Sequence, residues 1–244
     1  MLSAEKIQEN WENLLELVSK SFSWEKEKIV FDFLNKYEDR LALMPASGKT
    51  SYHNAFPGGY VDHVLRVWSL AFQVKELWEK NRADINFTDE ELATVVFFHD
   101  LGKFGDYSHE YYVQNTSEWH VKNKGEVYMY NPSLSFMKVS DRSLFLAQSL
   151  GVKLTENEYL GIKLHDGLYE EANKSYLISY SPEYALQSNL AHIVHQADMA
   201  ASKIEQGLIS PKKGLKKDSS KTDGLQPKTF VKNKYSHSKL LKDL

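Results

Sequence analysis

The chain lacks cysteine and any long apolar run, and each absence narrows what it can be. Without cysteine, the 244 residues form no disulfide, use no thiolate nucleophile and hold no zinc or iron–sulfur cluster through sulfur. Any metal must therefore be bound by histidine, aspartate, glutamate or backbone oxygen. No segment approaches the roughly 20 apolar residues of a membrane span, and the N-terminus carries charges where a signal peptide is apolar. We expect a soluble, cytoplasmic protein.

Charge is distributed unevenly along the sequence. Residues 211–244 contain ten lysines and three aspartates, a net charge of +7, which leaves −10 for residues 1–210 out of the total of −3. The acidic body does not favour a broad nucleic-acid surface. The tail has little apolar periodicity, which indicates a basic, flexible extension. Its last leucines, Leu240, Leu241 and Leu244, are candidates for a docking end.

The periodicity of apolar residues predicts helices over most of the chain. Residues 60–79 carry an apolar stripe at spacings of four and three: His63, Val67, Leu70, Val74 and Leu77. The next predicted helix begins with the capping box at 88–91 and ends before Gly102. It carries His99 on its apolar stripe and places Asp100 at its C-terminal end.

Two further helices are predicted in the second half of the sequence. A second capping box, at 155–158, begins a shorter helix that ends at the pair His165 and Asp166. Its stripe contains Gly161 and Ile162, so we expect His165 to be less deeply buried than His99. Over 188–205 the predicted buried face consists of Ile193, Ala197, Ala201 and Ile204, with Asp198 at its margin.

The remaining segments have simpler interpretations. Helices over 6–20 and 24–43 are expected to serve as packing elements. Residues 107–140 break the helical pattern with aromatic residues, glycine and proline, which predicts a long loop or short hairpin that covers a site.

Four residues on inner faces or margins of these helices form a candidate metal site: His63, His99, Asp100 and Asp198. Burying an isolated carboxylate destabilises the fold unless a cation lies beside it. Imidazole and carboxylate ligands suit Mn²⁺, Fe²⁺, Co²⁺, Ni²⁺ or Zn²⁺ better than Ca²⁺, which prefers oxygen ligands.

At these positions the chain resembles the HD-domain superfamily of metal-dependent phosphohydrolases. The resemblance covers about residues 45–205 and rests on four segments in the family's order, FPGGYVDHVLRV, VVFFHDLGK, LTENEYLGIKLHDG and HQADMAAS. It implies an all-α, HD-domain helical bundle over 45–210, with packing helices over 1–44, a long irregular insertion and the basic tail over 211–244.

The resemblance also implies roles for individual residues. A divalent metal ion (Mn, Fe, Co, Ni, Zn or Mg) would be bound by the four residues of the candidate site, and Lys103 would contact a substrate phosphate. His165 matches a histidine that some branches use for substrate or for a second metal. The chain has no His-His dipeptide, so one metal is expected rather than two. Asp100 is a candidate acceptor of the proton of the attacking water.

Other residues have weaker claims on the site. His165, His109 and Asp106 are unranked candidates for the proton donor to the leaving group. Arg66 lies one turn after His63 and is a candidate phosphate clamp. Further histidines that could join the site are His53, His120 and His195, the last of which is otherwise explained as an exposed polar-face residue. Three aromatic residues favour core or lid packing over stacking on a base: Trp119, Tyr128 and Tyr130.

Three functions follow as hypotheses. The first is an enzyme, a phosphohydrolase (phosphomonoesterase, nucleotidase or phosphodiesterase) that acts on a nucleotide or related small phosphoester through metal-activated water. The second is a 3′–5′ exonuclease on oligonucleotides, which the acidic body disfavours. The third is a non-catalytic nucleotide-sensing or scaffold protein. The substrate and the oligomeric state are left open by the sequence, since loop shape decides specificity.

Overall fold

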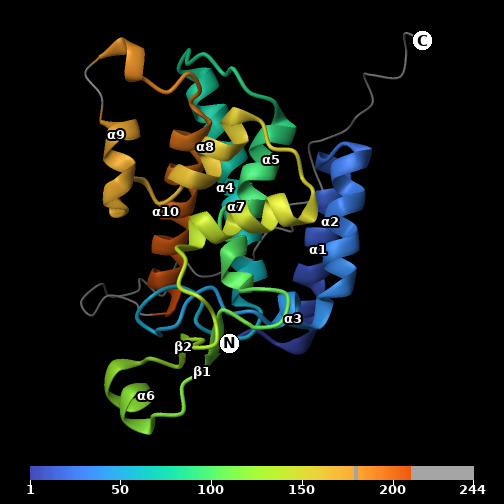
Figure 1. The fold of residues 1–244 in the computed structure, drawn as a ribbon, viewed down its shortest axis with the longest axis vertical. Helices are drawn as coiled ribbons and strands as arrows, with labels where there is room; N and C mark the ends of the chain where they lie inside the picture. The colour runs from blue at the N-terminus through green and yellow to red at the C-terminus, as the bar shows by residue number, and fades with distance from the viewer. Residues whose placement is uncertain (179–180, 210–244) are drawn as a thin grey trace, which may run out of the picture. The chain divides into compact units, whose positions relative to one another are not determined.

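The computed structural model describes residues 1–178 and 181–209, and it is mostly helical (Figure 1). These residues belong to one unit, Met1–Ser210. The expected basic extension, with Leu240, Leu241 and Leu244, lies outside the described residues. In chain order the α-helices are α1 (Ala4–Ser21), α2 (Trp24–Lys36), α3 (Glu38–Leu43), α4 (Gly59–Lys80), α5 (Asp89–Phe98), α6 (Glu118–Lys124), α7 (Val139–Leu150), α8 (Glu156–Leu164), α9 (Lys174–Leu177) and α10 (Leu190–Ile209).

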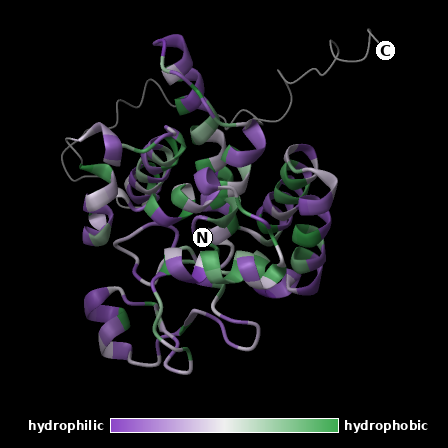
Figure 2. Cartoon of the chain, turned by 45° about the horizontal axis from the view of Figure 1, so that its top comes forward, coloured by the Kyte–Doolittle hydropathy of each residue, from purple (hydrophilic) through white to green (hydrophobic). Residues whose placement is uncertain are grey.

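Helices α4, α5, α8 and α10 form the middle of this unit, and α1, α2 and α3 pack against one side of it (Figure 1). Their apolar faces share one core, and hydrophilic residues lie along the outward faces of the ribbon (Figure 2). The N-terminal helices contribute fully to that core through Trp11, Leu14 and Leu34. The segment 1–44 therefore shares a core with the helices that carry the candidate site.

Both predicted capping boxes are confirmed. The Thr88 hydroxyl accepts from the Glu91 backbone N–H while the Glu91 carboxylate accepts from the Thr88 N–H, and Thr155 and Glu158 repeat the arrangement. The Thr155 hydroxyl also donates to Glu91 at 2.7 Å, so the two helix starts are joined. Helices α5 and α8 consequently run from adjacent N-termini.

Some boundaries differ from the prediction. The helix expected over 24–43 is interrupted at Tyr37, between α2 and α3. The ring of Tyr37 packs against Phe33 and Phe104 at centroid distances of 5.4 and 5.1 Å, which fixes the chain at the break.

Residues 107–140 contain a short antiparallel hairpin, β1 (Tyr112–Gln114) and β2 (Tyr128–Tyr130), with Tyr112 opposite Tyr130. Helix α6 connects the two strands (Figure 1). The hairpin form of the prediction is confirmed, and α6 is an addition to it. Trp119 on α6 is 58% exposed, so it is not a core residue, whereas the Tyr130 hydroxyl packs back onto its own segment by donating to Leu134 O.

The predicted stripes of α4 and α10 are confirmed except at the last predicted residue of each helix. Leu77 on α4 is exposed, and the core also contains Val64, Trp68 and Ala71. On α10 the predicted Ile204 is 44% exposed while Glu205 is 1% exposed. A carboxylate thus occupies a position on the buried face of α10.

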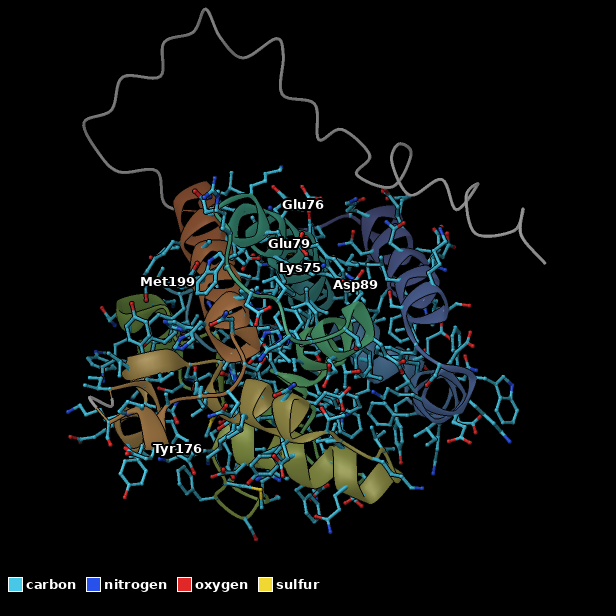
Figure 3. All side chains as sticks on the ribbon, turned by 90° about the horizontal axis from the view of Figure 1, so that it is seen from above. Lys75, Glu76, Glu79, Asp89, Tyr176 and Met199 are labelled. Atoms are coloured by element: carbon cyan, nitrogen blue, oxygen red, sulfur yellow. The ribbon has the colours of Figure 1, made fainter. Side chains whose placement is uncertain are left out.

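An ion-pair cluster joins the end of α4 to the start of α5 (Figure 3). Lys75 contacts Glu79 and Asp89, each at 3.0 Å. These are partly exposed pairs and contribute little individually, but they close the connection between the two helices that carry His63 and His99. Among the helices of the described residues, none combines the length and apolar composition of a membrane span.

Gly102 lies in the turn after α5, where the backbone of α7 comes too close for a side chain. A Cβ on Gly102 would lie 2.1 Å from the carbonyl oxygen of Val139. Ser143 on α7 joins the same turn, since its hydroxyl accepts from the Gly102 N–H at 2.8 Å and donates to His99 O at 3.0 Å. This contact fixes the turn that follows His99, which contains the 3₁₀ helix η1 (Leu101–Phe104).

We predict that Gly102→Ala destabilises the protein by about 1–3 kcal/mol, because the new methyl group overpacks against a backbone carbonyl that cannot rotate away. Urea unfolding measures the change. Gly207→Ala is the matched control, since no atom lies within 4 Å of a Cβ there. It should leave the free energy of unfolding unchanged or raise it by up to about 1 kcal/mol. Equal stability of both variants would contradict the close approach.

Candidate metal centre

His99 and His165 occupy equivalent positions at the C-terminal ends of α5 and α8. Each ring directs Nδ1 to the carbonyl oxygen three residues before it, His99 to Val96 at 2.7 Å and His165 to Ile162 at 2.8 Å. Donation from Nδ1 leaves Nε2 of each ring as the atom that faces the site. The ring centroids are 5.1 Å apart.

His165 is more deeply buried than the sequence predicts, at 1% exposure against 0% for His99. The reason is Gly161, which allows α8 to pack directly on α5. A Cβ at Gly161 would lie 2.7 Å from a methyl carbon of Val95. The glycine that suggested a weaker apolar stripe is therefore what brings α8 close to α5.

His63 comes from α4 and is held by Glu205, a residue that the sequence analysis did not select. Nδ1 of His63 lies 3.0 Å from Glu205 Oε2, and both side chains are fully buried. A carboxylate that accepts from one imidazole nitrogen orients the ring and leaves the other nitrogen for a ligand. Glu205 lies two helical turns after Asp198, and that spacing is the signal by which it could have been found.

Asp100 and Asp198 bring carboxylate oxygens to the same place. Asp198 Oδ1 lies 3.1 Å from His63 Nε2. Asp100 Oδ2 lies 3.6 Å from Nε2 of both His63 and His99. The structure thus brings together all four residues of the candidate metal site from α4, α10 and the turn after α5.

The pKa values of His63 and His99 are shifted in opposite directions. Burial lowers the pKa of His63, but the carboxylates of Asp198 and Glu205 outweigh burial and raise it to about 10. For His99, burial dominates over the charge of Asp100 and lowers the pKa to about 4. His99 is therefore a neutral imidazole, while His63 lies where positive charge is strongly favoured.

Lys103 is paired with Asp100 rather than extended into solvent. Its Nζ lies 2.5 Å from Asp100 Oδ2. Burial would raise the pKa of Asp100, but Lys103 and the neighbouring His99 and His165 hold it well below its usual value. His165 Nε2 lies 3.7 Å from Asp100 Oδ1, so both oxygens of this carboxylate face positively charged or protonatable groups.

The geometry fits a cation. Nε2 of His99 is buried and has no hydrogen-bond partner among the described residues, and the 3.1 Å contact of His63 Nε2 with Asp198 lacks hydrogen-bond geometry. One ligand atom from each of His63, His99 and Asp198 can be chosen so that all lie within 4.8 Å of one another. Buried nitrogens without partners, next to carboxylates, can hold a metal ion.

A cavity of about 150 Å³ opens beside the cluster. Its polar lining consists of His53, Asp100, Lys103, Asp166, His195 and Asp198, and Tyr169, Met199 and Ser202 complete it. His165 contacts Asp100 but is not among these lining residues. Contrary to the polar-face interpretation, His195 lies on the cavity wall, where its Nδ1 donates to His165 O at 2.8 Å.

Arg66 has a different role from a phosphate clamp. Its Nε donates to Glu205 Oε1 at 3.0 Å, and its Nη2 lies 3.6 Å from Asp62. The guanidinium therefore compensates the buried charge of Glu205. It acts on the cluster through His63 and does not line the cavity.

Three other candidates lie in local pairs away from the cavity lining. His109 and Asp106 contact each other at 3.2 Å on an exposed turn. His120 on α6 lies 2.5 Å from Glu126 in the hairpin. The structure does not bring these three residues to the candidate site.

We predict that Glu205→Leu weakens binding of a divalent metal by roughly 10- to 100-fold, because His63 loses the acceptor that orients it. Glu205→Gln keeps an oxygen acceptor and should recover most of the affinity. Isothermal titration of the metal-free proteins measures both, and thermal unfolding establishes that each variant is folded. Equal affinity in the folded Leu variant would show that Glu205 does not position the ligand.

A comparison of the chain with protein-family models, curated proteins and solved structures finds no match. The assignment of a function therefore rests on the residues and their geometry.

Proposed function

We propose that the protein is a metal-dependent phosphohydrolase of the HD type that cleaves a phosphoester of a nucleotide or a related small molecule. One observation carries the proposal: the carboxylates of Asp100 and Asp198 line a cavity together with the ammonium group of Lys103, and the buried imidazoles of His63 and His99 contact these carboxylates from behind the cavity wall. A cation site beside a fixed positive charge is the combination that phosphoryl transfer requires.

The cation would be held by His63, His99, Asp100 and Asp198. When bound, a divalent metal supplies Lewis acidity toward a phosphoryl oxygen and lowers the pKa of water. The mixed nitrogen and oxygen donors favour Mn, Fe, Co, Ni or Zn, with Mg as a weaker fit because it prefers oxygen. Four protein ligands leave positions open in a five- or six-coordinate ion.

The chain's own residues supply charge and proton transfer. Burial lowers the pKa of Lys103, but Asp100 outweighs burial and raises it above its usual value, so the ammonium group stays charged. It stabilises negative charge on the non-bridging oxygens as water attacks phosphorus and the ester P–O bond breaks. Asp100 accepts the proton that the water loses.

His165 is suited to holding Asp100 in place for this transfer. Burial lowers the pKa of His165, but the charges of Asp166 and Asp100 raise it to about 9, so the ring is protonated at neutral pH. From 3.7 Å it faces the Asp100 oxygen that Lys103 does not contact. Asp100 passes the proton of the water to the leaving oxygen and so returns to its ionised form, while His165 keeps its own proton and is a positioning residue.

The cavity limits which part of a substrate enters. A volume of about 150 Å³ equals about five water molecules at roughly 30 Å³ each. This suffices for a phosphoryl group and water but is below the roughly 300 Å³ of a typical pocket for a whole small ligand. The remainder of the substrate would contact the rim, where Tyr169 is 77% exposed and Met199, which Figure 3 labels, is 40% exposed.

We predict that Asp100→Ala abolishes both tight metal binding and phosphate release. The variant loses a ligand and the proton acceptor together, so turnover should fall by at least about 10³-fold. Metal content by atomic emission and a screen of nucleoside mono-, di- and triphosphates, cyclic nucleotides and short oligonucleotides provide the readouts. Asp141→Ala, which removes a surface carboxylate paired with Lys163, is the control and should behave as wild type. Unchanged hydrolysis in Asp100→Ala would refute the proposed mechanism.

Lys103→Ala should separate charge stabilisation from metal binding. We predict that kcat falls by roughly 10²- to 10³-fold, the range for removing one donor to a developing oxyanion, while the metal remains bound. Lys163→Ala, which removes a partly exposed lysine outside the cavity lining, is the matched control. If Lys103→Ala retained full kcat, Lys103 would have no role in stabilising the transition state.

A further inference from the structure

His53 lines the cavity, but the mechanism above gives it no role. It lies in the loop between α3 and α4 and lines the cavity with Lys103, Asp100 and Asp198. Its ring faces that of His63 at a centroid distance of 4.7 Å and an angle of 34°. Nε2 of His53 is buried without a hydrogen-bond partner among the described residues. A buried polar atom without a hydrogen-bond partner destabilises the fold unless a ligand supplies that partner.

The loop holds His53 in place from both sides. The Ser47 hydroxyl donates to His53 O at 2.6 Å. The next residue, Asn54, is 3% exposed and adopts a left-handed conformation with φ +46°, which asparagine tolerates better than most residues other than glycine. Its amide nitrogen donates to Asp62 at 2.9 Å and to Gly59 O at 3.3 Å. These contacts hold the backbone on both sides of His53.

Among the described residues, Lys103 is the one ammonium group on the cavity wall near His53, and the carboxylates of Asp100, Asp166 and Asp198 line the same cavity. Lys103 and His53 line the cavity together, and each offers a donor. A group with oxygen acceptors and negative charge satisfies both, whereas a second cation would be repelled by Lys103.

We propose that His53 and Lys103 form a subsite for a phosphoryl oxygen, to which His53 donates from Nε2. This inference rests on the proposed function and names the chemistry of the subsite, a tetrahedral oxyanion bound next to the cation. His53 also lies near His63 and Glu205 in a set of candidate metal ligands. That alternative is disfavoured because Nδ1 of His63 and Glu205 are already bonded to each other at 3.0 Å.

The test is binding of inorganic phosphate to the metal-loaded full chain, measured by isothermal titration. We expect His53→Ala to weaken phosphate binding by about tenfold or more, the effect of losing one hydrogen bond to a charged group. His53→Gln retains an N–H donor and should bind within about threefold of wild type. Metal affinity should be unchanged in both variants. His120→Ala, a histidine of the hairpin paired with Glu126, is the control and should bind phosphate as wild type does.

The outcomes separate this inference from the proposed function. Unchanged phosphate affinity in His53→Ala, with turnover of wild type intact, overturns the subsite alone. Loss of metal in His53→Ala also overturns it, because His53 would then be a ligand. If wild type binds phosphate through His53 but releases none from any ester, the subsite stands and the hydrolase function fails. If metal-loaded wild type binds no phosphate, both fail.

Discussion

The placement of three carboxylates inside a helical core is the constraint on which the rest of the structure depends. Asp100, Asp198 and Glu205 lie where burial disfavours charge, and each needs a positive partner. Lys103 serves Asp100, and Arg66 serves Glu205. Asp198 contacts Nε2 of the His63 imidazole, and Glu205 contacts Nδ1 of the same ring. Since Lys103 and Arg66 already offset Asp100 and Glu205, the remaining carboxylate, Asp198, has the His63 imidazole as its partner. A divalent cation could take the place of a proton at His63 Nε2 beside Asp198, so the cluster could hold a metal ion.

The C-terminal ends of two helices supply two of the histidines in this cluster. Helices α5 and α8 each begin with a capping box and end with a histidine whose Nδ1 is engaged by the carbonyl three residues earlier. The joined N-termini and the contact at Gly161 set the two histidines side by side. Glu205 performs the same function for His63 from another helix. In each case a fixed Nδ1 directs Nε2 toward Asp100, His63 and His99 to its Oδ2 and His165 to its Oδ1.

The sequence predicted the parts of the site that follow from local periodicity. His63, His99, Asp100 and Asp198 were selected because stripe position and capping boxes are readable along one helix. The partners of Glu205, Arg66 and His53 depend on which helices and loops face each other, and no local pattern contains that information. The same limit explains the errors at Ile204 and His165. Near the end of α10 the core takes Glu205 in place of Ile204, and the close approach at Gly161 buries His165.

Titration of the metal-free wild-type chain with Co²⁺ tests the cation site most directly. Cobalt bound by nitrogen and oxygen ligands gives visible absorption, and binding to the folded state alone raises the temperature of unfolding. The account predicts a band that saturates at one equivalent, together with a higher melting temperature. An unchanged spectrum and an unchanged melting temperature at excess Co²⁺ would contradict it, because the buried carboxylates would then be satisfied by the protein alone.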